Sequence, residues 1–157
     1  MELNAEARVT IARPREQVWA VVVDVETIPR VWKGRGAIPG TLKAEVVGGG
    51  PLTLDGVRRV HNTDGSVVDE RIVELTVPSR QAYVLEKGLK VPFTLLVKKA
   101  RGEWTLTESG GSTELVWLYR FFLTTPLVAP LARGVARSFG KAMQQGLDRL
   151  KQHIESP

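Results

Sequence analysis

The chain has 157 residues, of which 43% are hydrophobic and 25% charged, and these fractions exclude both a disordered protein and a membrane-spanning one. The absence of cysteine excludes disulfides, thiolate nucleophiles and thiolate metal sites. Twenty-two Lys and Arg against 17 Asp and Glu give a formal net charge of +5, which we interpret as a solvated basic surface, because the basic residues lack the interleaved aromatics of a nucleic-acid-binding face.

The N-terminal part is expected to hold one strand followed by two short helices. Between residues 5 and 11, apolar side chains alternate with polar ones, and this period of two predicts the first strand. Pro14 is tolerated in the first turn of a helix, so a helix is predicted over about 14–23. A second helical turn is expected to begin at Asp24 and to end around Pro29, because proline disfavours helix in the residue before it.

From residue 41 to about residue 122 the alternation predicts only strands. Six are expected, over 42–46, 57–62, 67–75, 80–85, within 93–107, and over 113–122. The pair Asp64 and Gly65 predicts a hairpin turn, and Gly110 with Gly111 predicts another. Successive strands with short turns favour an antiparallel meander, and a curved sheet of this kind can wrap around a long helix.

The C-terminal segment, from Thr125 to about Ile154, is predicted to form that helix. Its apolar residues lie mostly four apart and form one stripe: Leu127, Leu131, Val135, Phe139, Met143, Leu150 and Ile154. Gly134, Gly140 and Gly146 interrupt it, although each interior glycine destabilises a helix by about 1 kcal/mol relative to alanine. Either another backbone comes close to these glycines or they leave space for a ligand. Together with the charged strand faces described below, they lead us to expect the middle of the stripe to face a space and both of its ends to hold the fold.

The signatures of nucleotide-dependent and metal-dependent enzymes are absent. Residues 134–141 end in Gly-Lys like a phosphate loop, but five residues separate the glycines and Ala142 stands where Ser or Thr binds magnesium. With only His61 and His153, far apart, neither a metal site nor a cofactor is predicted. The first residues lack the basic start and apolar run of a secretory signal, so the cytoplasm is the expected location.

The strands predicted over 57–62 and 67–75 carry charged residues on both of their faces, which indicates either a buried ion pair or a hydrated cavity. One face of each strand should look inward, and an isolated buried charge is very costly. Arg58 and Glu70 lie opposite each other across the hairpin closed by Asp64 and Gly65, so they are the candidate pair. A surface salt bridge remains the alternative. The aromatic residues of the last two strands, which can face the helix, have core packing as their alternative role.

Four segments in this order resemble the START-related SRPBCC superfamily, and within it the bacterial polyketide cyclase/dehydrase and lipid-transport group. They are Pro14–Asp24 (PREQVWAVVVD) followed by Trp32, Arg58–Gly65 (RRVHNTDG), Val68–Leu75 (VDERIVEL) followed by Pro78 and Tyr83, and Thr113–Phe121 (TELVWLYRF). The resemblance implies an α+β helix-grip fold as one domain over residues 1–157. A seven-stranded antiparallel sheet would curve around the long C-terminal helix, with two short helices between strands 1 and 2 and an apolar cavity between sheet and helix.

The resemblance also implies which residues bind a ligand. In plant hormone-receptor relatives an arginine before the hairpin and a glutamate after it project toward the ligand, and these match Arg58 and Glu70. The other expected ligand-binding residues are Trp32, Val60, Tyr83, Trp104, Trp117, Tyr119, Phe139, Ala142, Met143 and Gly146. Ala100 stands where relatives often carry an aromatic residue early in the penultimate strand, so a hydroxyl at that place is lost.

Three functions remain open at this point. The leading hypothesis is a carrier or sensor that encloses a hydrophobic small molecule, such as a lipid, an isoprenoid or an aromatic polyketide, with Arg58 and Glu70 orienting its polar end. The alternative is a polyketide cyclase, aromatase or dehydratase in which Glu70 is the general acid or base and Arg58 holds an enolate or carboxylate. A third is a lipid-transfer protein whose basic surface makes weak contact with a membrane. No nucleic-acid partner is expected, and the oligomeric state is open.

Overall fold

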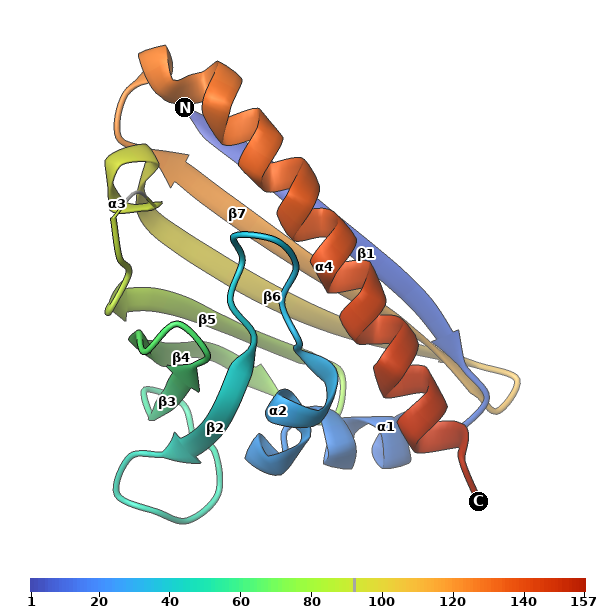
Figure 1. Ribbon diagram of the computed structural model, residues 1–157. Helices are drawn as coiled ribbons and strands as arrows, with labels where there is room; N and C mark the ends of the chain where they lie inside the picture. The colour runs from blue at the N-terminus through green and yellow to red at the C-terminus, as the bar shows by residue number, and fades with distance from the viewer. Residues whose placement is uncertain (92) are drawn as a thin grey trace.

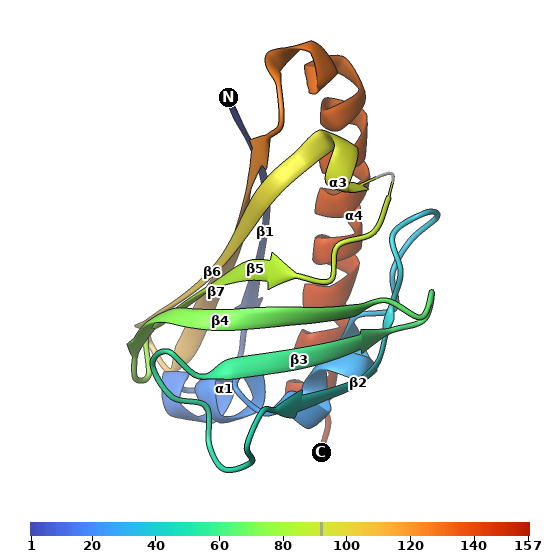
Figure 2. The same ribbon diagram turned by 90° about the vertical axis from the view of Figure 1, so that its left-hand side faces the viewer.

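The computed structural model describes residues 1–91 and 93–157 and shows a curved antiparallel sheet of seven strands that holds one long helix (Figures 1 and 2). The strands are β1 (Glu2–Ile11), β2 (Thr41–Val46), β3 (Val57–Asn62), β4 (Val67–Thr76), β5 (Arg80–Lys87), β6 (Val97–Ser109) and β7 (Ser112–Leu123). The helical segments are α1 (Arg15–Val22), η1 (Val25–Thr27), α2 (Ile28–Val31), α3 (Phe93–Leu96), η2 (Pro126–Val128) and α4 (Ala129–Glu155). The predicted fold class is confirmed.

The strand order is β1-β7-β6-β5-β4-β3-β2, so β2 to β7 form the predicted meander and β1 pairs with its last strand. The long β6–β7 hairpin turns at Gly110 and Gly111, whose φ angles are 60° and 79°. Glycine adopts this left-handed region without steric penalty, which explains the strong turn signal. The sheet therefore has two edges, β1 and β2, that lie far apart in space while the centre of the sheet bends around the helix (Figure 2).

Among the boundaries that differ from the prediction, two involve helical turns. Pro29 does not end the second helical segment but lies in the first turn of α2, where the missing N–H leaves no hydrogen bond unmade. The strand expected within 93–107 begins only at Val97, because the four residues before it form α3, and it extends to Ser109. Both differences bring helical turns to the ends of the sheet.

The long helix α4 crosses the concave side of the sheet and runs along β1 (Figure 1). Near its C-terminus Leu150 is buried, as the stripe predicted, and so is Leu147, which the stripe did not include. At its other end the prediction is wrong, since Leu127 and Leu131 are 89% and 65% exposed. Small residues face the sheet there instead, namely Ala129, Ala132 and Ala136. Alanines let the helix backbone approach the sheet closely, and the leucines then point away from it.

The three helix glycines have different surroundings. A methyl group at Gly146 would lie 3.6 Å from the Trp32 ring and 3.9 Å from Trp117, while one at Gly134 would have no neighbour within 4 Å. Neither the approach of another backbone nor space for a ligand accounts for Gly134. Gly140 meets only the Ala5 methyl, at 3.8 Å.

Gly134→Ala is expected to stabilise the protein, because the new methyl group meets nothing and the helix gains propensity. The free energy of unfolding should rise by about 0.5–1 kcal/mol. Chemical denaturation of the wild type, Gly134→Ala and Gly146→Ala measures this. Gly146→Ala is the comparison, since its methyl makes only ordinary van der Waals contacts. A Gly134→Ala variant no more stable than the wild type would contradict the explanation.

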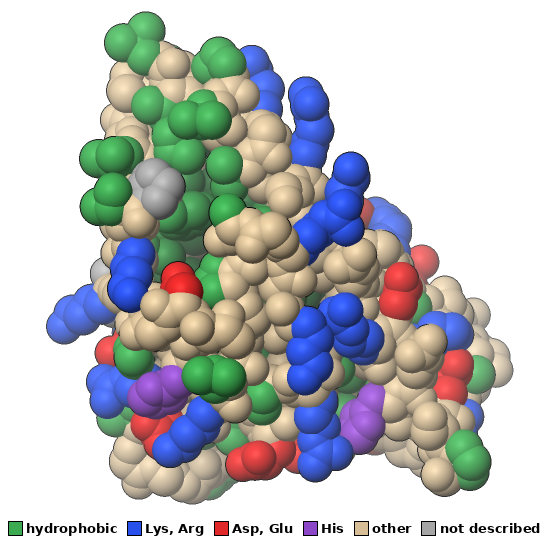
Figure 3. Space-filling model, viewed as in Figure 1, with side chains coloured by type: hydrophobic (Ala, Val, Ile, Leu, Met, Phe, Trp, Pro, Cys, Tyr) green, Lys and Arg blue, Asp and Glu red, His purple; other side chains and the backbone are tan. Residues whose placement is uncertain are grey.

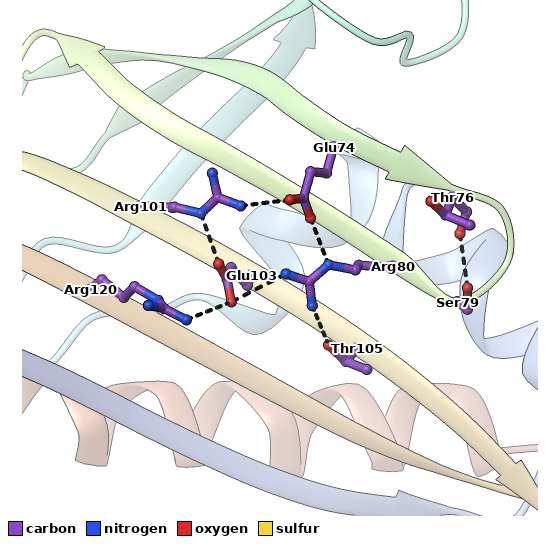
Figure 4. Close-up of polar contacts among 8 residues, drawn as sticks. All are labelled: Glu74, Thr76, Ser79, Arg80, Arg101, Glu103, Thr105 and Arg120. Carbon is purple, nitrogen blue, oxygen red and sulfur yellow. Dashed lines mark hydrogen bonds and ion pairs between the residues drawn. The ribbon is translucent and has the colours of Figure 1, made fainter.

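Ion pairs connect four strands on the outer face of the sheet (Figure 4). The Glu103 carboxylate, of which 8% is exposed, lies 2.8 Å from Arg101 Nε, 3.5 Å from Arg120 Nη2 and 3.6 Å from Arg80 Nη2. Glu74 contacts both Arg80 and Arg101, at 2.6 and 3.1 Å. Because the arginines come from β5, β6 and β7, this network ties neighbouring strands where the sheet curves.

Glu103→Ala is expected to lower the free energy of unfolding by about 2 kcal/mol, because three arginines lose a shared and nearly buried carboxylate. Glu114→Ala is the matched control. Its side chain is 52% exposed and its contact with Arg8 is 3.8 Å long, so a change below about 0.5 kcal/mol is expected. Urea denaturation compares the two, and equal effects would show that the Glu103 network adds nothing beyond a surface pair.

Candidate functional site

A cavity of about 350 Å³ lies between the concave face of the sheet and α4. Its wall is formed by inward-facing residues of β3 to β7, by α2 and the loop after it, by residues 88–91 and 93, and by one side of α4. Figure 3 shows the opening as a recess with hydrophobic side chains around and inside it. The volume and the mostly apolar wall are those of a small-molecule site.

Ten of the twelve predicted ligand-binding residues line this cavity. They are Trp32, Arg58, Val60, Glu70, Tyr83, Trp104, Trp117, Tyr119, Phe139 and Gly146. The other two lie elsewhere: Met143 is fully buried in the hydrophobic core with Ala136 and Leu147, and Ala142 is buried outside the lining. The stripe spacing could not separate these positions, because Met143 lies on the flank of α4 that packs on the sheet.

Sequence reasoning missed a part of the wall. The lining residues that were not among the predicted ligand-binding residues include Leu85, Ala100 and Phe121 on strands, Phe93 and Leu96 on α3, and Val135, Ser138 and Leu150 on α4. The signal for the helix residues was present, since Val135 and Leu150 belong to the apolar stripe. For α3 there was none, because its four residues also fit the alternating pattern of a strand.

Aromatic side chains form a continuous wall along one side of the cavity. Trp104 and Trp117 stack with ring centroids 4.4 Å apart, and the edge of Trp32 meets Trp117 at 5.4 Å. Phe139 on α4 lies 5.3 Å from Trp32 and 4.8 Å from Tyr119. Trp32 is also anchored, because its Nε1 donates to the carbonyl of Pro39 at 3.0 Å. These contacts give the cavity flat apolar surfaces that are already fixed in position.

The polar end of the cavity is built around one buried ion pair. Arg58 on β3 and Glu70 on β4 are opposite each other in register, and Arg58 Nη2 donates to Glu70 Oε2 at 3.2 Å. The residues are only 4% and 7% exposed. The Arg58 guanidinium also lies 4.9 Å from the centre of the Tyr83 ring, a cation–π distance. The predicted pairing across the hairpin is thus present, and it lies inside the protein and not on its surface.

Arg58 has more donors than this arrangement uses. Its buried Nε has no hydrogen-bond partner among the described residues, and its bond to Glu70 is a single one. A guanidinium carries five N–H donors, and leaving a buried donor unpaired is costly. Since Arg58 lines the cavity, it can donate a hydrogen bond to an acceptor group of a bound molecule.

The electrostatics keep this end of the cavity charged on the arginine and neutral on the tyrosines. Burial, the largest single effect, lowers the pKa of Arg58, but the charge of Glu70, its hydrogen bond and the nearby tyrosines together outweigh burial, and the net pKa is raised. Burial, and then the charge of Glu70, raise the pKa of Tyr83 to about 12. Burial also raises the pKa of Tyr119 well above its usual value. Both phenols therefore stay protonated near neutral pH, and they can act as hydrogen-bond donors.

The absence of a side chain at Gly102 leaves room for the ring of Tyr83. Gly102 pairs with Tyr83 on β5 and with Tyr119 on β7, and a Cβ atom there would overlap the Tyr83 ring and hydroxyl. The Tyr83 hydroxyl in turn accepts a hydrogen bond from Trp117 Nε1 at 3.3 Å. Sequence reasoning missed this residue, although an isolated glycine within a strand pattern is typical of a close approach.

Within residues 1–91 and 93–157, no group of three His, Cys, Asp or Glu side chains is arranged to hold a metal ion. Among the helices in the same residues, none is long and apolar enough to cross a membrane.

Solved structures with the same fold have low sequence identity. Ara h 8.0201 has a TM-score of 0.75 at 17% identity, with all of both chains covered. MLL2253 from Mesorhizobium loti has a TM-score of 0.74 at 15% identity, covering 98% of this chain and 97% of that one. The major latex-like protein 151 from Panax ginseng has a TM-score of 0.71 at 10% identity, covering 98% of each. Such identities support the fold alone.

Sequence comparisons supply the family. Curated protein sequences gave no match. The family model described as "Polyketide cyclase / dehydrase and lipid transport" matches residues 2–155, which is nearly the whole chain. This confirms the resemblance that the four sequence segments carried. The chain belongs to the polyketide cyclase/dehydrase and lipid transport family of SRPBCC proteins.

Proposed function

We propose that this protein encloses a hydrophobic small molecule in the cavity and acts as its carrier or sensor. The observation that carries the proposal is an apolar cavity of about 350 Å³ that ends in one buried, incompletely bonded arginine. The aromatic wall suits a lipid chain, an isoprenoid or a fused aromatic system equally well. The ligand class is therefore defined by its apolar body and its polar end.

The polar end of the ligand is expected to be an acceptor. Arg58 Nε and the protonated hydroxyl of Tyr83 are the donors available to it, and Glu70 keeps the arginine in place through the bond at its Nη2. A carbonyl, a carboxylate or a phenolate oxygen meets these requirements. Hydrogen bonds to charged groups stabilise a complex by about 1.5–3 kcal/mol, so this contact orients the ligand while the apolar wall supplies most of the affinity.

Catalysis of a polyketide cyclisation or dehydration is the second candidate, and one observation favours it. Glu70 lines the cavity, and its Oε1 accepts no hydrogen bond within the part of the chain that the structure describes. A carboxylate oxygen in that position can take a proton from a bound substrate, with Arg58 stabilising the enolate formed. The fold is also shared with DynU16, a protein of the dynemicin biosynthetic locus, of which this chain covers 47%.

Native mass spectrometry of the protein purified from its own host tests the proposal. We expect the protein to carry a hydrophobic molecule that stays bound in the folded state and is released on denaturation. Identification of that molecule names the ligand class. If the protein instead carries nothing and also fails to bind anilinonaphthalene sulfonate, whose sulfonate can meet Arg58, the carrier function is wrong.

Glu70→Gln separates the carrier from the enzyme. Glutamine keeps an acceptor for Arg58 but cannot take up a proton, so a carrier should retain its ligand. An enzyme that uses the Glu70 proton would lose turnover by a factor of roughly 10² or more. The measurement is conversion of the identified molecule by the wild type and by the variant, with ligand retention followed in parallel.

A further inference from the structure

Exposed aliphatic side chains gather at the end of the molecule where the cavity opens. We name Val91, Leu95, Leu127 and Leu131 the mouth patch, and they are 71%, 62%, 89% and 65% exposed. They come from the loop before α3, from α3 and from the chain at the start of α4. Hydrophobic side chains dominate this end of the surface, at the upper left of Figure 3.

Backbone contacts hold the two parts of the mouth patch together. The Thr124 hydroxyl donates to the carbonyl of Leu95 at 2.7 Å, and the Thr124 amide donates to the carbonyl of Leu96 at 3.0 Å. In both ribbon views α3 lies beside the N-terminal end of α4 (Figures 1 and 2). The four side chains therefore belong to one surface.

The mouth patch continues into the cavity. Val91 is itself a lining residue, although most of its side chain is exposed. On α4, Leu131 precedes the lining residue Val135 by four positions, which places the two on the same face of the helix. Apolar side chains thus extend from the outside of the protein into the lining of the cavity.

The two segments that carry the mouth patch are basic. Residues 87–102 and 115–147 contain nine of the 22 Lys and Arg and none of the 17 Asp and Glu, although Asp64 lies beside Lys90 and Glu2 beside Arg120. Lys98, Arg133 and Arg137 are exposed and form no ion pair within residues 1–91 and 93–157. The rest of the chain has more acidic than basic residues. An anionic surface is therefore complementary to this end, whereas a second copy of the same patch would be repelled.

We propose that the mouth patch docks on an anionic lipid bilayer, with its aliphatic side chains in the acyl boundary and the surrounding Lys and Arg against the headgroup phosphates. This inference rests on the proposed function, because docking would place the cavity opening against the phase in which a hydrophobic ligand is dissolved. A bilayer fits the shape of the surface better than a protein partner does, since the leucines protrude singly and a fluid surface needs no matching pockets.

Vesicle flotation tests the docking. The wild type is expected to float with vesicles of phosphatidylcholine containing phosphatidylglycerol, less with phosphatidylcholine alone, and less again as salt is raised. The double variant L127E/L131E should bind the mixed vesicles at least roughly tenfold more weakly, because two exposed leucines no longer enter the membrane. Both leucines are mostly exposed, so the double variant should remain folded.

The double variant V47E/L54E is the matched control. It makes the same change in charge, and a similar change in hydrophobicity, at two side chains that are 46% and 56% exposed on the β2–β3 loop, away from the mouth patch. Equal loss of binding in both double variants would show that the loss comes from the change in net charge alone, and it would overturn the proposal. So would the absence of flotation by the wild type, or binding that is insensitive to L127E/L131E.

Binding of anilinonaphthalene sulfonate in the absence of vesicles distinguishes the two proposals. If the cavity binds the probe and the protein does not float, the docking inference fails while the carrier function stands. If the protein floats but its cavity binds neither the probe nor a molecule from the host, the carrier function fails. Both proposals are supported if L127E/L131E alone loses flotation and still binds the probe as the wild type does, and if the host molecule displaces that probe.

Discussion

Glu70→Ala is expected to lower the free energy of unfolding by about 3–5 kcal/mol, because it leaves the buried Arg58 guanidinium without a counter-ion. The Arg58 side chain is 5% exposed, so water that reaches it through the cavity replaces the lost carboxylate only in part. Tyr83, at a cation–π distance, offsets only a small part of the lost charge interaction. Thermal and urea denaturation measure the loss.

The double variant Arg58→Met with Glu70→Leu is the control for that loss. Two apolar residues of similar volume need no partners, and replacing a buried pair in this way is often neutral or stabilising. We expect near wild-type stability together with affinity for anilinonaphthalene sulfonate reduced by roughly tenfold or more, as the charged hydrogen bond is removed. A stable double variant with unchanged probe affinity would show that Arg58 does not bind the sulfonate, the polar end of the probe.

Gly102→Ala is expected to destabilise the protein by about 3 kcal/mol, because its methyl group would overlap the ring and hydroxyl of Tyr83. Tyr83 is 2% exposed and lies between neighbouring strands, so the ring has little room to withdraw on the side away from the cavity. Displacement into the cavity would break the hydrogen bond from Trp117 and fill the space next to Arg58. Probe binding should therefore fall together with stability.

A double-mutant cycle isolates the contact between Gly102 and Tyr83. In a Tyr83→Ala background the new methyl group has nothing to overlap, so Gly102→Ala should change stability by less than about 1 kcal/mol. The single and double variants are compared by urea denaturation. If Gly102→Ala destabilises both backgrounds equally, the effect comes from the β6 backbone and the explanation given for the glycine is wrong.

Much of the polar site was predictable because strand alternation and turn chemistry fix register. The Asp64-Gly65 turn sets the hairpin, and that alone places Arg58 opposite Glu70. Whether the pair faced solvent or a cavity depended on the curvature of the whole sheet, which a local pattern does not contain. The resemblance to a family supplied the curvature, and with it the ten lining residues.

What the sequence could not predict depends on distances between elements. The apolar stripe of α4 shows which residues are hydrophobic, but not which of them the sheet reaches, so the exposure of Leu127 and Leu131 was missed. Met143 was placed in the cavity for the same reason. Gly102 escaped notice because its role appears only when the ring of Tyr83, nineteen positions earlier, is in place.

The aromatic wall makes the protein its own optical reporter. Three of the four tryptophans, Trp32, Trp104 and Trp117, line the cavity, and only Trp19 lies outside the lining. Two of these indoles are stacked at 4.4 Å with their planes inclined by 20°, so their transitions are coupled. A molecule that enters would lie against them and alter both their emission and their near-ultraviolet circular dichroism. Ligand libraries can therefore be screened on the unlabelled protein, with occupancy measured from the cavity wall itself.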